Sequence, residues 1–317
     1  MNGNRFQILS LDGGGIKGVF SAAVLAMIEE DLSVNVSDYF DLIAGTSTGG
    51  IIALGLGAGL RPKEIVEFYL KNGPNIFSCP RIRQVLHFVF RKYSRSPLET
   101  ALKDCFGEMK FGESQKRLII TSFSLSSNDI YLFRTAHCEH LKRDYKVPMV
   151  NVAMATSAAP TYFSAYKGID KMRLIDGGVW ANNPVMVAVT EAVSFLKIPL
   201  SNVYAASVGT TEAVFKRTNW LDYGGKFVWA GQAPSVIMDG QSISATNQAA
   251  NLLGSEHFMR IDPKVGNGEF SLDGVHSKDD LLARAAHVSR KLIPEFQRKF
   301  LSHSAQKFVP IRQIERP

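Results

Sequence analysis

Ser47 stands in a short turn of small residues that could expose a reactive hydroxyl. The pentapeptide Gly45-Thr-Ser-Thr-Gly49 follows an apolar run and precedes a segment of small, helix-compatible residues. Glycines at this spacing allow the sharp strand-to-helix turn called a nucleophile elbow, because they remove the Cβ atoms that would collide there. We therefore predict that Ser47 is a nucleophile and that Gly45, Thr48 and Gly49 support the elbow.

A second glycine-rich turn precedes the first in the chain. Asp12-Gly-Gly-Gly-Ile-Lys-Gly18 also lies between an apolar run and a helical pattern. The backbone N–H groups of Gly13, Gly14 and Gly15 would point out of a helix N-terminus, where negative charge is favoured, so they could form an oxyanion hole. The segment also fits the G-x-G-x-x-G pattern of dinucleotide-binding loops, but the acidic residue expected after the next strand is replaced by the Ser47 turn.

The nucleophile needs a base, and the sequence offers two kinds. Asp176 ends an apolar run, and Gly177 after it allows the backbone to approach a neighbouring turn closely. An apolar pocket could raise the pKa of this carboxyl group toward neutrality, which would suit a base that acts on Ser47 directly. The alternative is a histidine, as in other hydrolases that carry this elbow. The histidines considered are His257, His276, His287 and His303.

Strand and helix patterns alternate along the chain, which favours a mainly parallel sheet with helices on both faces. Strands are expected at Phe6–Leu11, Tyr39–Ala44, Lys116–Ser124, Ile130–Phe133, Lys171–Ile175, Val203–Val208 and His257–Asp262. Helices are expected at Val19–Leu32, Gly50–Leu60, Pro62–Leu70, Pro97–Phe106, Pro148–Ala155, Pro184–Phe195, Val236–Leu253 and Ser277–Phe300. The third of these helices is predicted to stop at Asn72-Gly73-Pro74. We predict a single domain over residues 1–317.

Composition indicates an ordinary globular protein with a basic surface. Of the 317 residues 36 are Lys or Arg and 29 are Asp or Glu, giving a formal charge of +7, which suggests a negatively charged partner. Anionic lipid and nucleic acid both satisfy that condition. Cys79, Cys105 and Cys138 show neither even pairing nor a CxxC spacing, so neither disulfides nor a structural zinc site is indicated, and a reducing cytoplasm fits best.

Any contact with a membrane is expected to be peripheral. Met1–Arg5 lacks a charged region followed by an apolar stretch that ends in small residues, so no secretory signal is expected. The longest apolar run, Gly50–Leu60, falls well short of the roughly 20 residues that span a bilayer. Residues 77–96 contain a basic amphipathic pattern. We predict either a cap that touches anionic headgroups or an ordinary surface helix there.

The motifs together resemble the patatin-like phospholipase family. The resemblance rests on Asp12–Gly18, Gly45–Gly49, Ala155-Thr-Ser-Ala-Ala-Pro160 and Asp176-Gly-Gly178, in this order. It implies a three-layer α/β/α sandwich and hydrolysis of phospholipid acyl esters by a Ser47–Asp176 dyad without metal or other cofactor. It also implies an oxyanion hole at Gly13, Gly14 and Gly15, and Lys17 stands where the family carries Arg or Lys.

A narrower resemblance is to bacterial patatin-like effectors of anti-phage defence. It rests on the compact layout, on Asn247–Gly254 and on His257–Asp262. It implies activation by a cyclic di- or trinucleotide, possible homo-oligomers, and a cytoplasmic enzyme that acts at the inner face of the membrane, with no DNA or RNA polymer as partner. Two other functions stay open: a nucleotide-binding regulatory module without hydrolase activity, and a general soluble carboxylesterase.

Overall fold

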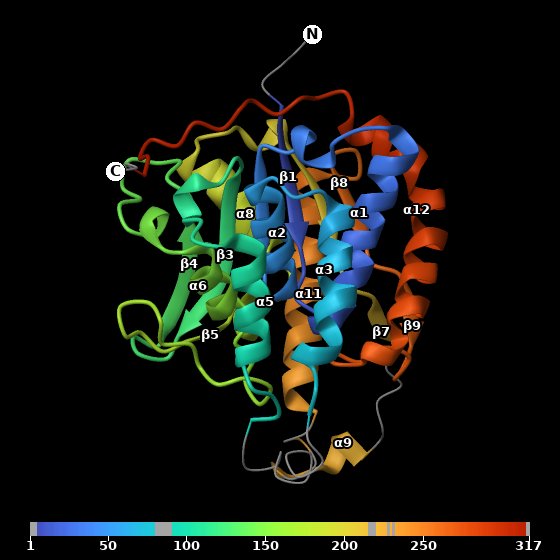
Figure 1. Cartoon of the computed structure of the whole chain (residues 1–317). Helices are drawn as coiled ribbons and strands as arrows, with labels where there is room; N and C mark the ends of the chain where they lie inside the picture. Colours follow the sequence, from blue (N-terminus) through green and yellow to red (C-terminus); the bar gives the residue numbers. More distant parts are fainter. Residues whose placement is uncertain (1–4, 80–90, 215–219, 227–228, 230–231, 315–317) are drawn as a thin grey trace.

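A computed structural model describes residues 5–79, 91–214, 220–226, 229 and 232–314 (Figure 1). These residues form a seven-stranded sheet with the order β4-β3-β2-β1-β6-β8, in which β5 also pairs with β3. The strands of this sheet are β1 (Phe6–Leu11), β2 (Leu42–Gly45), β3 (Arg117–Ser124), β4 (Asp129–Arg134), β5 (Leu174–Asp176), β6 (Val203–Val208) and β8 (Phe258–Ile261). β4 and β5 run antiparallel to β3, and the other neighbours are parallel. The expected mainly parallel sheet is confirmed.

Helices cover both faces of the sheet (Figure 1). They are α1 (Gly18–Leu32), α2 (Thr48–Ala58), α3 (Pro62–Ile76), α5 (Ser96–Phe106), α6 (Met149–Thr156), α7 (Gly178–Ala181), α8 (Val185–Thr190), α9 (Trp220–Tyr223), α11 (Ala233–Leu253) and α12 (Lys278–Phe300). A π-helical turn, Glu191–Phe195, follows α8. Two further short strands, β7 (Glu212–Val214) and β9 (Lys264–Gly266), form a separate parallel pair.

The central strand β1 separates two hydrophobic cores. Its six residues are all buried, as expected for a strand covered on both faces. Because side chains alternate along a strand, Leu9 and Leu11 face the larger core, which α1, α2, α3, α5, α6 and α12 cover, while Phe6 and Ile8 face the smaller core beneath α8 and α11. Both cores lie against one sheet, which supports the proposal of a single domain.

The short strand β5 brings a distant part of the chain to the end of β2. One edge of β3 pairs with β2 at residues 117–120 and with β5 at residues 122–124. The other edge of β3 pairs with β4. β5 runs antiparallel to β2, so the two strands point toward each other along β3. Gly45 lies opposite Ile120 and Asp176 lies opposite Ser122, so the carboxyl ends of the two strands meet.

One predicted helix end is wrong, and most of the predicted cap is not described. The α3 helix does not stop at Asn72-Gly73-Pro74 as predicted, since it continues to Ile76 with Pro74 inside its last turn. Ile76 is buried in the larger core, and this burial offsets the hydrogen bond that the proline cannot donate. Residues 80–90, which form most of the predicted cap at 77–96, lie outside the described residues.

Candidate active site

Ser47 forms the tip of a strained turn between β2 and α2. Its backbone has φ 54° and ψ −121°, a conformation that costs a non-glycine residue of the order of 1–3 kcal/mol. The flanking glycines make the turn possible: a Cβ atom on Gly45 would collide with the carbonyl of Gly49, and one on Gly49 would collide with the carbonyl of Leu11. The elbow predicted from the spacing of these residues is therefore present, and the Ser47 side chain is partly exposed.

Hydrogen bonds to four neighbouring elements, α6, α2, α7 and β1, hold this turn. The Ser47 N–H donates to Thr156 Oγ1 on α6 at 2.9 Å, and the Ser47 carbonyl accepts from Ile51 N at 3.0 Å. The preceding residue, Thr46, donates its hydroxyl to the Ala181 carbonyl at 2.6 Å. Its N–H donates to the Leu11 carbonyl at 3.1 Å. These contacts over-determine the backbone, which is what a strained conformation needs in order to persist.

Asp176 lies at the end of β5 beside Ser47. Its side chain is only 5% exposed. Oδ1 accepts a hydrogen bond from Gly178 N at 2.7 Å, and the Ser47 hydroxyl lies close enough to the carboxylate to influence its pKa. Burial raises the pKa of Asp176 to about 6, and the Ser47 hydroxyl and the Gly178 N–H oppose a larger rise. At pH 7 the group is mostly ionised, yet it is a stronger base than an exposed aspartate.

The glycine loop, Asp12–Gly18, lies next to the elbow. The backbone amides of its residues Gly13, Gly14 and Gly15 are not equivalent. A Cβ atom on Gly13 would approach Ser47 Cβ to 3.2 Å. The Gly13 N–H already donates to the Asn182 carbonyl at 3.0 Å, so it is not free to stabilise an oxyanion. Within the described part of the chain, the amides of Gly14 and Gly15 donate to no protein acceptor. Of the three amides predicted to form an oxyanion hole, those of Gly14 and Gly15 thus remain available for that role.

The remaining predicted residues have structural contacts. A Cβ atom on Gly177 would collide with Thr121 on β3, which explains the need for glycine as the chain leaves β5. The Thr48 hydroxyl forms a 2.5 Å hydrogen bond with the Tyr69 hydroxyl on α3. Lys17 Nζ donates to the Thr211 carbonyl at 3.1 Å, and burial lowers the pKa of this lysine. Lys17 therefore fixes the loop after β6 and does not reach Ser47 through any of these contacts.

A buried network of ion pairs holds Asp12, the first residue of the glycine loop. Arg260 on β8 forms two hydrogen bonds with the carboxylate of Asp12, at 3.0 and 2.6 Å, and a third with Asp262 at 2.6 Å. Burial alone would lower the pKa of Arg260, but the two carboxylates outweigh burial and raise it. Arg260, Thr156 and Asn182 were not among the predicted site residues. Thr156 stands inside the Ala155–Pro160 motif and Arg260 inside the His257–Asp262 segment, whereas Asn182 belongs to none of the segments that carry the resemblance.

Two of the histidines considered as bases lie at the amino ends of the parallel strands, opposite the carboxyl ends where Ser47 lies. His303 Nε2 contacts Asp41 Oδ2 at 2.7 Å, just before β2 begins, and the His257 ring stacks on Tyr204 at 3.9 Å, just before β8 begins. Ser47 lies at the carboxyl end of β2. These two side chains therefore cannot reach the Ser47 hydroxyl without a rearrangement of the sheet.

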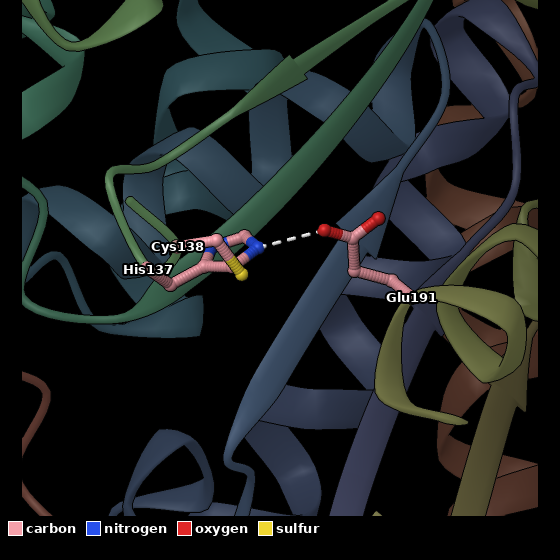
Figure 2. A group of neighbouring side chains, drawn as sticks. All are labelled: His137, Cys138 and Glu191. Carbon is pink, nitrogen blue, oxygen red and sulfur yellow. Dashed lines mark hydrogen bonds and ion pairs between the residues drawn. The ribbon is translucent and has the colours of Figure 1, made fainter. Parts of the chain in front are cut away.

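Among the residues that the structure describes, one cluster contains metal-ligand types (Figure 2). His137, Cys138 and Glu191 each offer one atom within 4.8 Å of the others. His137 Nε2 contacts Glu191 Oε1 at 2.9 Å, and Arg134 Nη1 pairs with Glu191 Oε2 at 3.2 Å. The guanidinium group already compensates the only carboxylate in the cluster, which disfavours a divalent cation there.

Among the described residues, no helix is both long and apolar enough to cross a bilayer.

An α/β/α sandwich with a serine elbow and a glycine loop at the carboxyl edge of its sheet is an architecture used by acyl hydrolases. The model of the patatin-like phospholipase family matches residues 9–189. A cGAMP-activated phospholipase from Pseudomonas aeruginosa is 30% identical over 313 residues, covering 95% of this chain and 93% of that protein. A protein of the same name from Vibrio cholerae is 36% identical over 229 residues, covering 65% of this chain and 64% of that protein.

A plant protein extends the range of relatives. Patatin-like protein 4 from Arabidopsis thaliana is 38% identical over 210 residues, covering 59% of this chain and 52% of that protein. The chain belongs to the patatin-like phospholipase family. It is accordingly a lipid hydrolase, as the sequence resemblance implied.

Proposed function

We propose that the protein hydrolyses acyl esters of membrane phospholipids through a Ser47–Asp176 dyad. Ser47 Oγ attacks the ester carbonyl while Asp176 accepts the hydroxyl proton, and the Gly14 and Gly15 amides hold the negative oxygen. Collapse of this intermediate releases the alcohol, which takes the proton from Asp176. Water then attacks the acyl-enzyme, Asp176 accepts a proton from that water, and the fatty acid leaves as Ser47 regains its own.

One observation carries this proposal. A strained serine elbow and a buried carboxylate stand at the ends of two strands that meet head to head, and the Ser47 hydroxyl lies close enough to the carboxylate to lower its pKa. Neither the strain at Ser47 nor the burial of an ionised Asp176 stabilises the fold. Groups kept in such costly states are concentrated at functional sites.

The net charge of the chain supports a membrane substrate, and the names of the relatives support control of activity by a nucleotide. A formal charge of +7 favours binding to anionic bilayer surfaces, so we propose a peripheral enzyme that works from the cytoplasm on the inner membrane face. Two of the relatives described above are named cGAMP-activated phospholipases. We therefore propose low basal activity that a cyclic di- or trinucleotide raises, together with a change of oligomeric state.

Release of fatty acid from mixed phospholipid vesicles tests the proposed function. The assay is run with and without a panel of cyclic nucleotides, and a fluorophosphonate probe reports the nucleophile. Nucleotide-dependent release with Ser47-dependent labelling supports the proposal. Nucleotide binding without labelling would instead indicate a regulatory module, and turnover of short soluble esters alone would indicate a carboxylesterase. High activity that no nucleotide changes would remove the switch from the proposal.

The raised pKa of Asp176 predicts an acid limit to activity near pH 6. Only the ionised carboxylate accepts a proton from Ser47, so protonation at lower pH removes the base. We expect kcat/KM for a soluble ester to fall about tenfold per pH unit below about pH 6 and to level off above pH 7. A soluble substrate avoids the altered pH at charged vesicle surfaces. An acid limit near pH 4, where exposed aspartates titrate, would contradict this assignment.

A further inference from the structure

The turn Ser271–Gly274 lies directly against the glycine loop. The Leu272 carbonyl accepts a hydrogen bond from Ile16 N at 2.9 Å. A Cβ atom on Gly15 would collide with that same carbonyl, and Gly15 has a φ of +59°. The position of Leu272 therefore fixes the backbone at Gly15, whose amide is one of the two proposed oxyanion donors.

The residue after Leu272 is held by a partly buried cluster of charged and polar groups. Asp273 Oδ2 accepts hydrogen bonds from Lys92 Nζ at 2.5 Å and from the Tyr93 hydroxyl at 2.6 Å. The side chains of Lys92 and Asp273 are 26% and 13% exposed, so solvent screens this ion pair less than a surface pair. We call Asp273, Lys92 and Tyr93 the Asp273 cluster.

The charge of Asp273 persists over the pH range in which the dyad works. Burial alone would raise the pKa of Asp273, but the hydrogen bonds from Lys92 and Tyr93 hold it below its ordinary value. The groups that face the carboxylate are Lys92, Tyr93 and the Ser271 hydroxyl, which donates to Oδ1 at 3.2 Å. None of these loses its role between pH 5 and pH 8.

The other end of the cluster is anchored on the side of the site that carries Asp176. Lys92 N donates to the Thr161 carbonyl and Tyr93 N to the Tyr162 carbonyl, both at 2.9 Å. The Tyr93 ring also stacks on the Tyr162 ring, with centroids 6.2 Å apart. The same loop after α6 contains Ala158, whose carbonyl accepts from Asp176 N at 3.1 Å. The Asp273 cluster therefore connects the backbone around the base with the backbone around the oxyanion donors.

We propose that Asp273 is a positioning residue for ester hydrolysis, which fixes the Leu272 carbonyl and thereby aims the Gly15 amide at the oxyanion. The proposal rests on the hydrolytic function proposed above. Oxyanion donors act mainly in the transition state, so their misplacement lowers kcat more than it changes KM. Placement within about 0.5 Å is required for full effect, so a small shift of the loop is sufficient.

Asp273→Asn tests the proposal, because it keeps the shape of the side chain and removes its charge. We expect kcat per folded molecule to fall about tenfold, with KM for a soluble ester changed less than twofold. Binding of a trifluoromethyl ketone, which mimics the tetrahedral intermediate, should weaken by the same factor as kcat. Tyr93→Phe should cause a smaller loss. The double variant should be no worse than Asp273→Asn alone, because both changes disable one cluster.

Glu269→Gln is the matched control. Glu269 lies in the same connection between β9 and α12 and pairs with Arg284 at 3.0 Å, but the pair is about one third exposed and does not contact the glycine loop. We expect its kcat to stay at the wild-type value. A kcat loss in Glu269→Gln equal to that in Asp273→Asn would overturn the proposal, and so would an unchanged kcat in Asp273→Asn.

The two proposals fail in distinguishable ways. Fluorophosphonate labelling and ester turnover in the wild-type protein report the dyad alone. If that turnover does not depend on Ser47, both the dyad and the positioning role are wrong. If it depends on Ser47 while Asp273→Asn changes only the melting temperature, Asp273 is structural and the dyad stands.

Discussion

Replacing Ser47 with alanine removes fatty acid release from phospholipid vesicles and abolishes fluorophosphonate labelling. Loss of the nucleophile in serine hydrolases lowers kcat by about 10³- to 10⁶-fold, and we expect a loss in that range. The fold should persist, because the backbone contacts of Ser47 with Thr156 and Ile51 do not involve its hydroxyl. The melting temperature and the rate of release are measured on the same preparation.

Two further variants make this experiment specific. Ser10→Ala is the control: its buried hydroxyl on β1 has no partner among the described residues, so its removal should leave labelling and turnover unchanged. Ser47→Gly should lose activity like Ser47→Ala but unfold at a higher denaturant concentration, since glycine relieves about 1 kcal/mol of backbone strain at positive φ. Labelling that survives in Ser47→Ala would place the nucleophile elsewhere.

Asp176→Asn lowers activity and raises stability at the same time. An asparagine still accepts the hydrogen bond from Gly178, but it cannot take the proton from Ser47, so we expect kcat to fall by at least about a thousandfold. Burial raises the pKa of Asp176 from 3.8 to about 6, so the folded protein binds this proton more tightly than the unfolded chain does.

The sign of the stability effect follows from that difference. The contribution of Asp176 is most favourable below pH 4 and is lost as the pH rises through about 6, when a buried negative charge forms. Asparagine avoids this charge. A difference of two pKa units corresponds to up to about 3 kcal/mol in the free energy of unfolding at pH 8, and to little at pH 4.

Urea unfolding of both proteins at the two pH values measures this effect. Asp170→Asn, at a site that is 64% exposed, should show no such gain. A less stable Asp176→Asn protein at pH 8 would show that the ionised carboxylate stabilises the fold. In that case the raised pKa would be the wrong explanation.

The sequence was sufficient for most strands of the main sheet and for the longer helices, and it supplied the residue types of the proposed site. The continuous apolar run of β1 and the glycines around Ser47 are local signals, because each reflects a steric or burial requirement of its own segment. The head-to-head meeting of β2 and β5 is not local. It depends on β5 pairing with residues 122–124 at the carboxyl end of β3. The three residues of β5 carry no recognisable preference for that partner.

Other parts of the site depend on tertiary contacts that leave no pattern. The glycine run suggested three equivalent donors, but the Asn182 carbonyl engages Gly13 and leaves two. Arg260 lies in an ordinary apolar strand, and only the parallel neighbours β1, β6 and β8 bring it to Asp12. The extension of α3 past Pro74 likewise follows from packing of Ile76 rather than from helix signals.

The shared edge of β3 has a mechanical consequence. Because β2 and β5 are both hydrogen-bonded to one neighbour, any sliding or twisting of that strand carries Ser47 and Asp176 together and leaves their separation unchanged. The glycine loop follows β1, which pairs with β2 but not with β3, so it does not share this neighbour. The proposed nucleotide switch is therefore expected to change the alignment of the main-chain amides, while the proposed Ser47–Asp176 pair keeps its geometry.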